Sequence, residues 1–85
     1  MDIEYSKEVV KYLNRLENKS KKRIKEALKK LSVIPPGGDI KQLQAQRNLY
    51  RLRVGDFRIL FSIHAEKNII LINEIGMRGE IYKHL

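Results

Sequence analysis

Hydrophobic residues follow a helical repeat in the first half of the chain and a strand-like alternation in the second half. Residues 1–5 alternate between polar and apolar side chains, which predicts a short strand. In residues 9–16 and 24–31 the apolar positions recur every three or four residues, which predicts two amphipathic helices. Residues 18–20 are expected to link them, with Ser20 as the N-cap of the second helix. So short a link favours an antiparallel helical hairpin.

A turn rich in proline and glycine at residues 35–39 separates these helices from the second half of the chain. Beyond it, hydrophobic alternation predicts three strands. They cover residues 49–54, 57–63 and 69–75. Gly55-Asp56 suits a two-residue hairpin turn between the first two of these strands. The residues after Gly76 have the spacing of a short helix.

Together these elements predict an α+β fold with one domain over residues 1–85. The expected architecture is a small antiparallel sheet of about four strands, with an N-terminal α-helical hairpin on one face and a short C-terminal helix. The chain has no cysteine, which excludes disulfides, cysteine-ligated metal and a thiol nucleophile. No grouping of His, Asp and Glu has the spacing of metal ligands, so no metal or other cofactor is expected. Neither a signal peptide nor an apolar run of membrane-spanning length is visible, which favours a cytoplasmic protein without membrane contact.

The turn at Gly55-Asp56 determines which residues of the hairpin oppose each other. The apolar pairs are Tyr50–Phe61, Leu52–Ile59 and Val54–Phe57. Directly opposed residues share a face of a sheet, and this apolar face is expected to pack on the helices. On the other face Arg53 opposes Arg58, and Arg51 lies two residues away. Because opposed like charges destabilise a sheet, this cluster indicates a site for an anion, and guanidinium groups suit successive phosphates.

The charge balance agrees with an anionic partner. The chain carries 18 basic and 10 acidic residues, a net charge of +8, which favours nucleic acid or an acidic protein. The surplus of positive charge is concentrated in two stretches. The basic residues of 19–30 are mostly lysine, and those of 47–58 are all arginine. Lysine is a mobile hydrated charge, whereas arginine offers a planar fork for phosphate or carboxylate, so the two stretches need not have the same function.

The C-terminal segment adds Arg78 and Tyr82, which are four residues apart and would be neighbours on a helix. The arginine would bind one more phosphate, and the tyrosine would stack on a base or exchange a proton. A packed tail, with Arg78 extending into solvent, is the alternative.

At residues 49–61 and 75–83 the sequence resembles the RelE/ParE superfamily of bacterial and archaeal toxins from toxin–antitoxin pairs. The shared elements are tyrosine-basic-x-basic from Tyr50, Gly-Asp-aromatic-Arg from Gly55 and Gly-x-Arg-x-x-x-Tyr from Gly76. The RelE branch implies a metal-independent endoribonuclease that cleaves mRNA in the ribosomal A site, leaves 2′,3′-cyclic phosphate and 5′-OH ends, and so inhibits translation. It also implies an acidic or partly disordered cognate antitoxin, with operator DNA contacted only through the antitoxin complex.

Carried over by position, the resemblance implies catalytic roles for Arg51, Arg53, Arg58, Arg78 and Tyr82. The functional interpretation of the other basic residues is contact with mRNA and the ribosome. These residues are Lys19, Lys21, Lys22, Lys25, Lys29 and Arg47. A solvated helix face is the alternative for the lysines. RelE itself has lysines where Arg51 and Arg53 stand, and arginine stays protonated, so the identity of a general base is open.

Four further alternatives stay open from the sequence. The hairpin arginines could form surface ion pairs with Glu74 or Glu66, or could receive acidic residues of the antitoxin. The chain could be a ParE-like, non-enzymatic inhibitor of DNA gyrase. It could also be an inactive toxin that serves as the co-repressor of an antitoxin.

Overall fold

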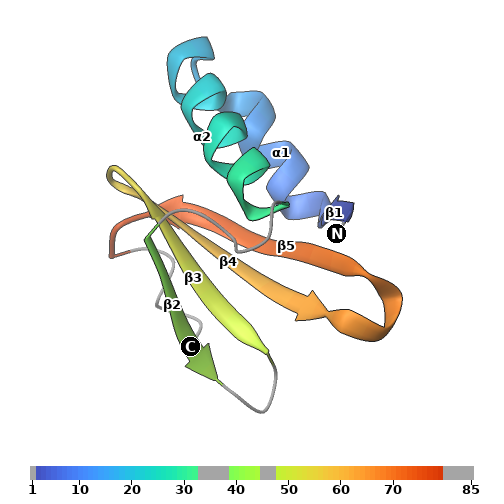
Figure 1. Cartoon of the computed structure of the whole chain (residues 1–85). Coiled ribbons are helices and arrows are strands. Elements are labelled where there is room, and N and C mark those ends of the chain that lie inside the picture. The colour runs from blue at the N-terminus through green and yellow to red at the C-terminus, as the bar shows by residue number, and fades with distance from the viewer. Residues whose placement is uncertain (1, 33–38, 45–47, 80–85) are drawn as a thin grey trace.

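The structure is a computed structural model, and it describes residues 2–32, 39–44 and 48–79. In these ranges the chain forms two α-helices and a five-stranded mixed sheet. The elements in chain order are β1 (Asp2–Tyr5), α1 (Lys7–Arg15), α2 (Asn18–Leu31), β2 (Asp39–Gln44), β3 (Leu49–Val54), β4 (Phe57–His64), the 3-10 turn η2 (Ala65–Lys67) and β5 (Ile69–Met77) (Figure 1).

Each helix is preceded by an N-cap residue with extended backbone, Ser6 for α1 and Glu17 for α2. Ser6 is the N-cap of α1, and its hydroxyl accepts a hydrogen bond from the backbone N–H of Val9 at 3.2 Å. Helix α2 begins at Asn18, with Glu17 as its N-cap. The predicted link at residues 18–20 and the predicted cap at Ser20 are therefore wrong. The hydroxyl of Ser20 instead lies in the first turn of α2 and donates to the Glu17 carboxylate at 3.3 Å.

The sheet has the strand order β1-β5-β4-β3-β2, with β1 parallel to β5 and every other pair antiparallel. The prediction of about four antiparallel strands is corrected in both respects. Strand β2 was not predicted because its two apolar residues, Ile40 and Leu43, are three positions apart and do not alternate with period two. This spacing is compatible with a strand because a bulge interrupts the pairing of β2 between Gln42 and Gln44.

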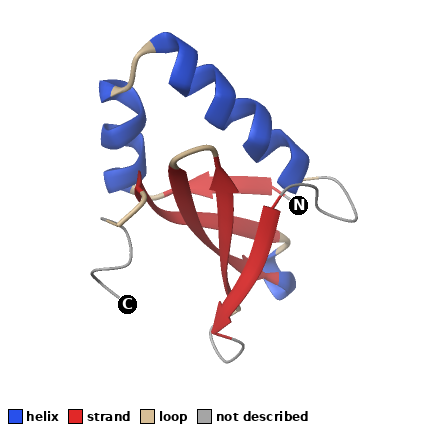
Figure 2. Ribbon diagram, turned by 90° about the vertical axis from the view of Figure 1, so that its left-hand side faces the viewer, coloured by secondary structure: helices blue, strands red, loops and turns tan. Residues whose placement is uncertain are grey.

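The predicted register of the central hairpin is confirmed, because Tyr50, Leu52, Arg53 and Val54 pair with the four residues expected for a Gly55-Asp56 turn. Its apolar side faces both helices, which lie on the same side of the sheet (Figure 2). The buried core comprises Val9, Ile24, Leu28 and Leu31 from the helices and Leu52, Ile59, Phe61, Ile70, Ile72 and Ile75 from the strands. Burial of this apolar area is the main stabilising contribution to the fold.

The turn between β3 and β4 is touched by α2. Gly55 has a φ of +58°, a left-handed conformation that glycine adopts without penalty. A Cβ added to Gly55 would lie 2.7 Å from Nη2 of Arg23, so the α2 guanidinium approaches the turn closely. The turn therefore joins the helix layer to the strand hairpin.

The last described strand is longer than predicted. Strand β5 runs through Gly76 to Met77, which pairs with Phe57, although a helix was predicted after Gly76. The backbone N–H of Arg78 then donates to the carbonyl of Asp56 at 2.8 Å. The remainder of the predicted C-terminal helix, including Tyr82, lies outside the described residues. Within the described ranges, neither helix has the length and apolar character to cross a membrane.

Candidate functional site

Three arginines share the side of the sheet that faces away from the helices. Arg53 lies directly opposite Arg58, as predicted, and Arg51 lies opposite Leu60. Their strand neighbours Leu52 and Ile59 are in the core, and successive side chains of a strand point to opposite faces. Arg51, Arg53 and Arg58 therefore form one cationic surface, here called the arginine face.

A carboxylate from the edge strand β2 joins two of these arginines. Asp39 lies opposite Arg53, and its Oδ2 forms an ion pair with Nη2 of Arg53. Its Oδ1 accepts a hydrogen bond from Nη2 of Arg51 at 3.1 Å. Arg51 and Arg53 therefore form ion pairs, but with Asp39 and not with Glu74 or Glu66, the partners that the sequence suggested. No ion pair of the described residues involves Glu66 or Glu74.

The third arginine is held by the turn. Nη1 of Arg58 donates to the carbonyl of Gly55 at 2.9 Å and to that of Phe57 at 3.0 Å. The residue is only 8% exposed, so these carbonyl contacts compensate a charge that is largely withdrawn from water. Arg53 and Arg58 are directly opposed across β3 and β4, but their guanidinium groups bind different partners. Arg53 pairs with Asp39 and Arg58 with backbone carbonyls of the turn, and this lessens the repulsion between the two charges.

Arg78 lies at the same end of the molecule as Arg58. Its backbone donates to Asp56 in the turn that holds Arg58, and Gly76, two residues earlier, pairs directly with Arg58. Arg78 is exposed. The structure thus brings four of the five predicted catalytic residues to the β3–β4 hairpin and its border, whereas Tyr82 lies outside the described residues.

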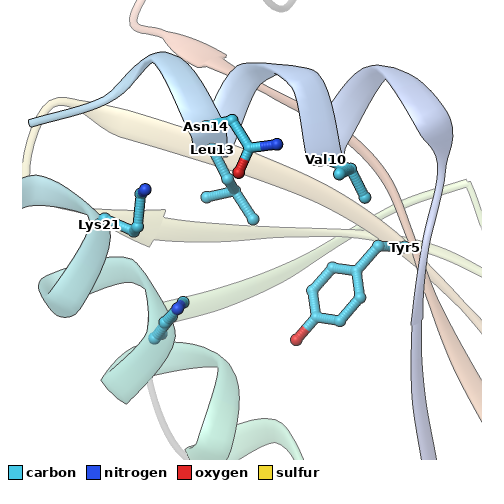
Figure 3. A pocket seen from close by; sticks show the side chains of 6 residues that line it. Tyr5, Val10, Leu13, Asn14 and Lys21 are labelled. Atoms are coloured by element: carbon cyan, nitrogen blue, oxygen red, sulfur yellow. The ribbon is translucent and has the colours of Figure 1, made fainter. Parts of the chain in front are cut away.

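The predicted RNA-binding lysines lie on α2, in the layer on the other side of the sheet. Lys21 and Lys25 border a groove of about 210 Å³ between the two helices and the end of β1. The groove is lined by Tyr5, Val10, Leu13, Asn14, Lys21 and Lys25, and Figure 3 shows these side chains around the same space, with all but Lys25 labelled. We call this the helix groove. Arg47, the remaining predicted contact, lies outside the described residues.

The helix groove is an apolar surface with a basic border. Tyr5 and Val10 are 43% and 45% exposed, although Val10 belongs to the apolar stripe predicted for the first helix. An adjoining hollow is lined by Lys25 and Lys29 of α2 together with Tyr5. Lys21, Lys25 and Lys29 are spaced four residues apart, so they follow one side of α2. Sequence periodicity could not show that Val10 lies beyond the area that the sheet covers.

Sequence reasoning missed Asp39 and a small polar network on the arginine side of β4. In this network Asn73 Nδ2 donates to the hydroxyl of Ser62 at 3.1 Å, and that hydroxyl lies 3.0 Å from Nε2 of His64. The shift of register between Leu60 and Phe61 places Asn73 within reach of Ser62, and a strand pattern does not reveal such a shift. In residues 2–32, 39–44 and 48–79, no three His, Asp or Glu side chains are grouped to hold a metal ion.

The family model described as ParE toxin of type II toxin–antitoxin system, parDE, matches residues 3–82. The chain therefore belongs to this family, within the RelE/ParE superfamily predicted from the hairpin and C-terminal motifs, and is a toxin of a type II toxin–antitoxin system. A Methanocaldococcus jannaschii protein named RelE1 is 33% identical over 86 residues, covering 98% of this chain and 96% of the relative.

Solved structures agree with the family assignment. The archaeal RelE-RelB complex from Pyrococcus horikoshii OT3 contains a chain with a TM-score of 0.80 and 28% identity, covering 93% of this chain and 96% of the other. In the RelB-RelE antitoxin-toxin complex from Methanococcus jannaschii the corresponding values are 0.76 and 26%, with 96% and 98% covered. The isolated E. coli RelE toxin, at 17% identity and a TM-score of 0.76 over 98% and 92% of the two chains, shares the fold.

Proposed function

We propose that this toxin is a metal-independent endoribonuclease that cleaves mRNA, in the ribosomal A site, and thereby inhibits translation. The observation that carries the proposal is the arginine face, where Arg53 and Arg58 are directly opposed and Arg51 is two residues away. Arg78 follows at the border of the same hairpin. Several guanidinium groups within one small area suit the phosphate of a nucleic acid backbone and the charge that develops on it during cleavage.

In the proposed reaction the 2′-hydroxyl oxygen of the RNA attacks the adjacent phosphorus, and the bond from phosphorus to the 5′ oxygen breaks. The 2′-hydroxyl loses its proton and the leaving 5′ oxygen gains one, giving a 2′,3′-cyclic phosphate and a 5′-OH end. Arg53 and Arg58 would bind the scissile phosphate, and Arg51 would position the RNA backbone. Arg78 would stabilise the charge on the leaving oxygen, and Tyr82 would stack on a base or exchange a proton.

The fixed orientation of Arg58 supports a role in stabilising charge. Both of its hydrogen bonds to the turn use Nη1, so one edge of the guanidinium is anchored to the backbone. A donor that is already oriented needs no reorganisation when charge develops, which is the main electrostatic contribution in many enzymes. Arginine cannot accept the 2′-hydroxyl proton, so these residues act by orientation and charge stabilisation.

The partners follow from the second basic region. We propose that the helix groove binds an acidic, amphipathic segment of a cognate antitoxin, because Tyr5 and Val10 expose apolar surface in the groove that Lys21 and Lys25 border. The likeness to toxin chains of two archaeal RelE–RelB complexes supports an antitoxin partner. The exposed Lys19 and Lys22 would contact the ribosome or mRNA, and operator DNA would be contacted only through the antitoxin complex.

The proposed function is tested with ribosomes programmed with a defined mRNA. We expect the wild-type protein to cut the message and leave 2′,3′-cyclic phosphate ends, and Arg58→Ala to lower the cleavage rate about 100-fold or more. Arg15→Ala is the matched control, since it removes an exposed arginine from the end of α1. Because Arg58 also binds the turn, each variant is first shown to be folded by its thermal transition, and Arg58→Lys tests whether charge without the planar fork is sufficient. An intact message with wild-type protein, or wild-type rates from Arg58→Ala, would contradict the proposal.

A second candidate function is inhibition of DNA gyrase without catalysis, which the match to a ParE toxin family model favours. Pulsed expression distinguishes the two functions. Rapid loss of mRNA supports cleavage, whereas a DNA-damage response with intact mRNA supports gyrase inhibition. Absence of any toxicity without the antitoxin would favour the third interpretation, an inactive toxin that acts as a co-repressor.

A further inference from the structure

We infer that Asp39 is a positioning residue of the arginine face: it keeps Arg51 in place, and it must release Arg53 when an RNA phosphate binds. The inference deepens the proposed function, because it concerns the same surface. Asp39 is the first residue of β2 and lies directly opposite Arg53. Its two carboxylate oxygens each bind a different arginine of the pair.

The carboxylate occupies the place of an anionic ligand. Carboxylate and phosphate both offer oxygens that accept from the same guanidinium fork. A phosphate that approaches Arg53 therefore competes with Oδ2 of Asp39 for Nη2 of that residue. Arg53 is available to a phosphate on the arginine face only when its contact with Asp39 is replaced by a contact with that phosphate.

The two contacts of Asp39 differ in how easily they are exchanged. The Arg51 side chain is 14% exposed, and its Nε is buried without a hydrogen-bond partner among the described residues. Removing Asp39 from this arginine would leave a nearly buried charge uncompensated, which is strongly unfavourable. The Arg53 side chain is 52% exposed, and an ion pair this open to water contributes little. The exchange should therefore release Arg53 and leave Arg51 bound to Asp39.

The neighbouring strand explains why Arg51 needs a carboxylate. Lys41 of β2 lies directly opposite Arg51, so two like charges are paired across the strands. Asp39 stands two residues from Lys41 and supplies the negative charge that makes this arrangement acceptable. Glu74 is another acid on this side of the sheet, since it pairs with Leu60, which in turn pairs with Arg51. In the described part of the chain Glu74 forms no ion pair, and it therefore offers a matched control.

The test measures binding and does not depend on cleavage. A short single-stranded RNA with 2′-deoxy substitutions, which cannot be cut, is titrated with the purified toxin between about 50 and 200 mM salt, followed by fluorescence anisotropy. Asp39→Asn keeps an oxygen for Arg51 but removes the charge that competes for Arg53. We expect it to bind the RNA about three- to fivefold more tightly at the lowest salt. The slope of log K against log salt should keep its wild-type value, because Arg53 contacts the same phosphate in both complexes once Asp39 has released it.

Controls separate this exchange from a change in total charge. Glu74→Gln removes the same charge from the same face and should leave the affinity for the RNA nearly unchanged. Arg53→Gln, alone or combined with Asp39→Asn, should make the slope shallower and abolish the gain in affinity. The inference is overturned if Asp39→Asn binds no more tightly than Glu74→Gln, or if Arg53→Gln binds like the wild type. Since Arg53 is half exposed, that variant gives a result even if Asp39→Asn does not fold.

The outcomes also separate this inference from the proposed function. Tighter RNA binding by Asp39→Asn, with no cleavage by the wild-type protein on ribosomes, would retain the exchange and reject the ribonuclease. Cleavage by the wild type, with unchanged binding by Asp39→Asn, would retain the ribonuclease and reject the exchange. If no variant binds the RNA, the exchange is rejected.

Discussion

The two sides of the sheet carry positive charge in different ways. On the helix side, Lys21 and Lys25 stand at the border of an apolar groove. On the open side, Arg51 and Arg58 are mostly withdrawn from water and bind fixed acceptors, a carboxylate and two backbone carbonyls. Net charge alone would treat these residues as equivalent. Their surroundings differ: the lysines border an apolar surface, as the proposed binding of a partner requires, whereas the arginines are held in fixed orientations, as the proposed catalytic role requires.

The contrast between the two sides of the sheet predicts that the helix groove affects binding of the antitoxin and not cleavage of mRNA. Val10→Glu places a charge on the apolar surface of the helix groove, where an antitoxin segment would cover it. We expect affinity for the cognate antitoxin to fall about 30-fold, roughly 2 kcal/mol, with mRNA cleavage unchanged. Calorimetric titration of the purified pair measures this effect. Val10→Ile, which keeps the surface apolar, should bind nearly as the wild type, and an equal loss in both variants would reject the groove as the antitoxin site.

The β3–β4 turn is the place where the two sides meet, since Arg23 approaches Gly55 from α2 and Arg58 binds its carbonyl from the arginine face. Gly55→Ala introduces a side chain at positive φ and should lower the free energy of unfolding by about 1 to 2 kcal/mol. Urea denaturation gives this value. Gly55→Asn should lose less, because asparagine tolerates the left-handed region. Equal losses from the two substitutions would show that contact with Arg23, and not backbone conformation, limits the turn.

The smallest effect is expected from exposed lysines of α2. Lys19→Gln combined with Lys22→Gln should raise the ribosome concentration needed for half-maximal cleavage about threefold and make its salt dependence shallower. The cleavage rate at saturating ribosomes should not change, because neither lysine lies on the arginine face. Lys7→Gln with Lys11→Gln removes two exposed charges from α1 as the control. A fall in the saturating rate would place α2 in the reaction itself.

The elements that depend on local pattern were predictable. The hairpin of β3 and β4 was predicted with its register, because alternation and a Gly55-Asp56 turn leave one pairing that keeps Arg58 out of the core. Helix α1 followed from the helical spacing of its apolar residues. Family membership followed from motifs on the same hairpin and on the C-terminal segment.

Features that depend on distant partners were not predictable. Strand β2 was missed because its apolar residues do not alternate with period two around the bulge. Since the strand was missed, the contact of Asp39 with Arg51 and Arg53 was missed as well. The parallel pairing of β1 with β5 joins segments far apart in the chain and leaves no local signal. The direction of the Arg58 guanidinium is a choice among rotamers of a long side chain, which the surrounding structure decides.

The pairing of β1 with β5 bears on how the toxin is made. Strand β1 is synthesised well before its hydrogen-bonding partner β5, and the Ser6 hydroxyl donates to the carbonyl of Asn73, 67 residues later. Contacts of such high sequence separation form late in folding. The sheet is therefore completed only after β5 has been synthesised, whereas the β3–β4 hairpin that carries the arginine face needs only local pairing and can form earlier.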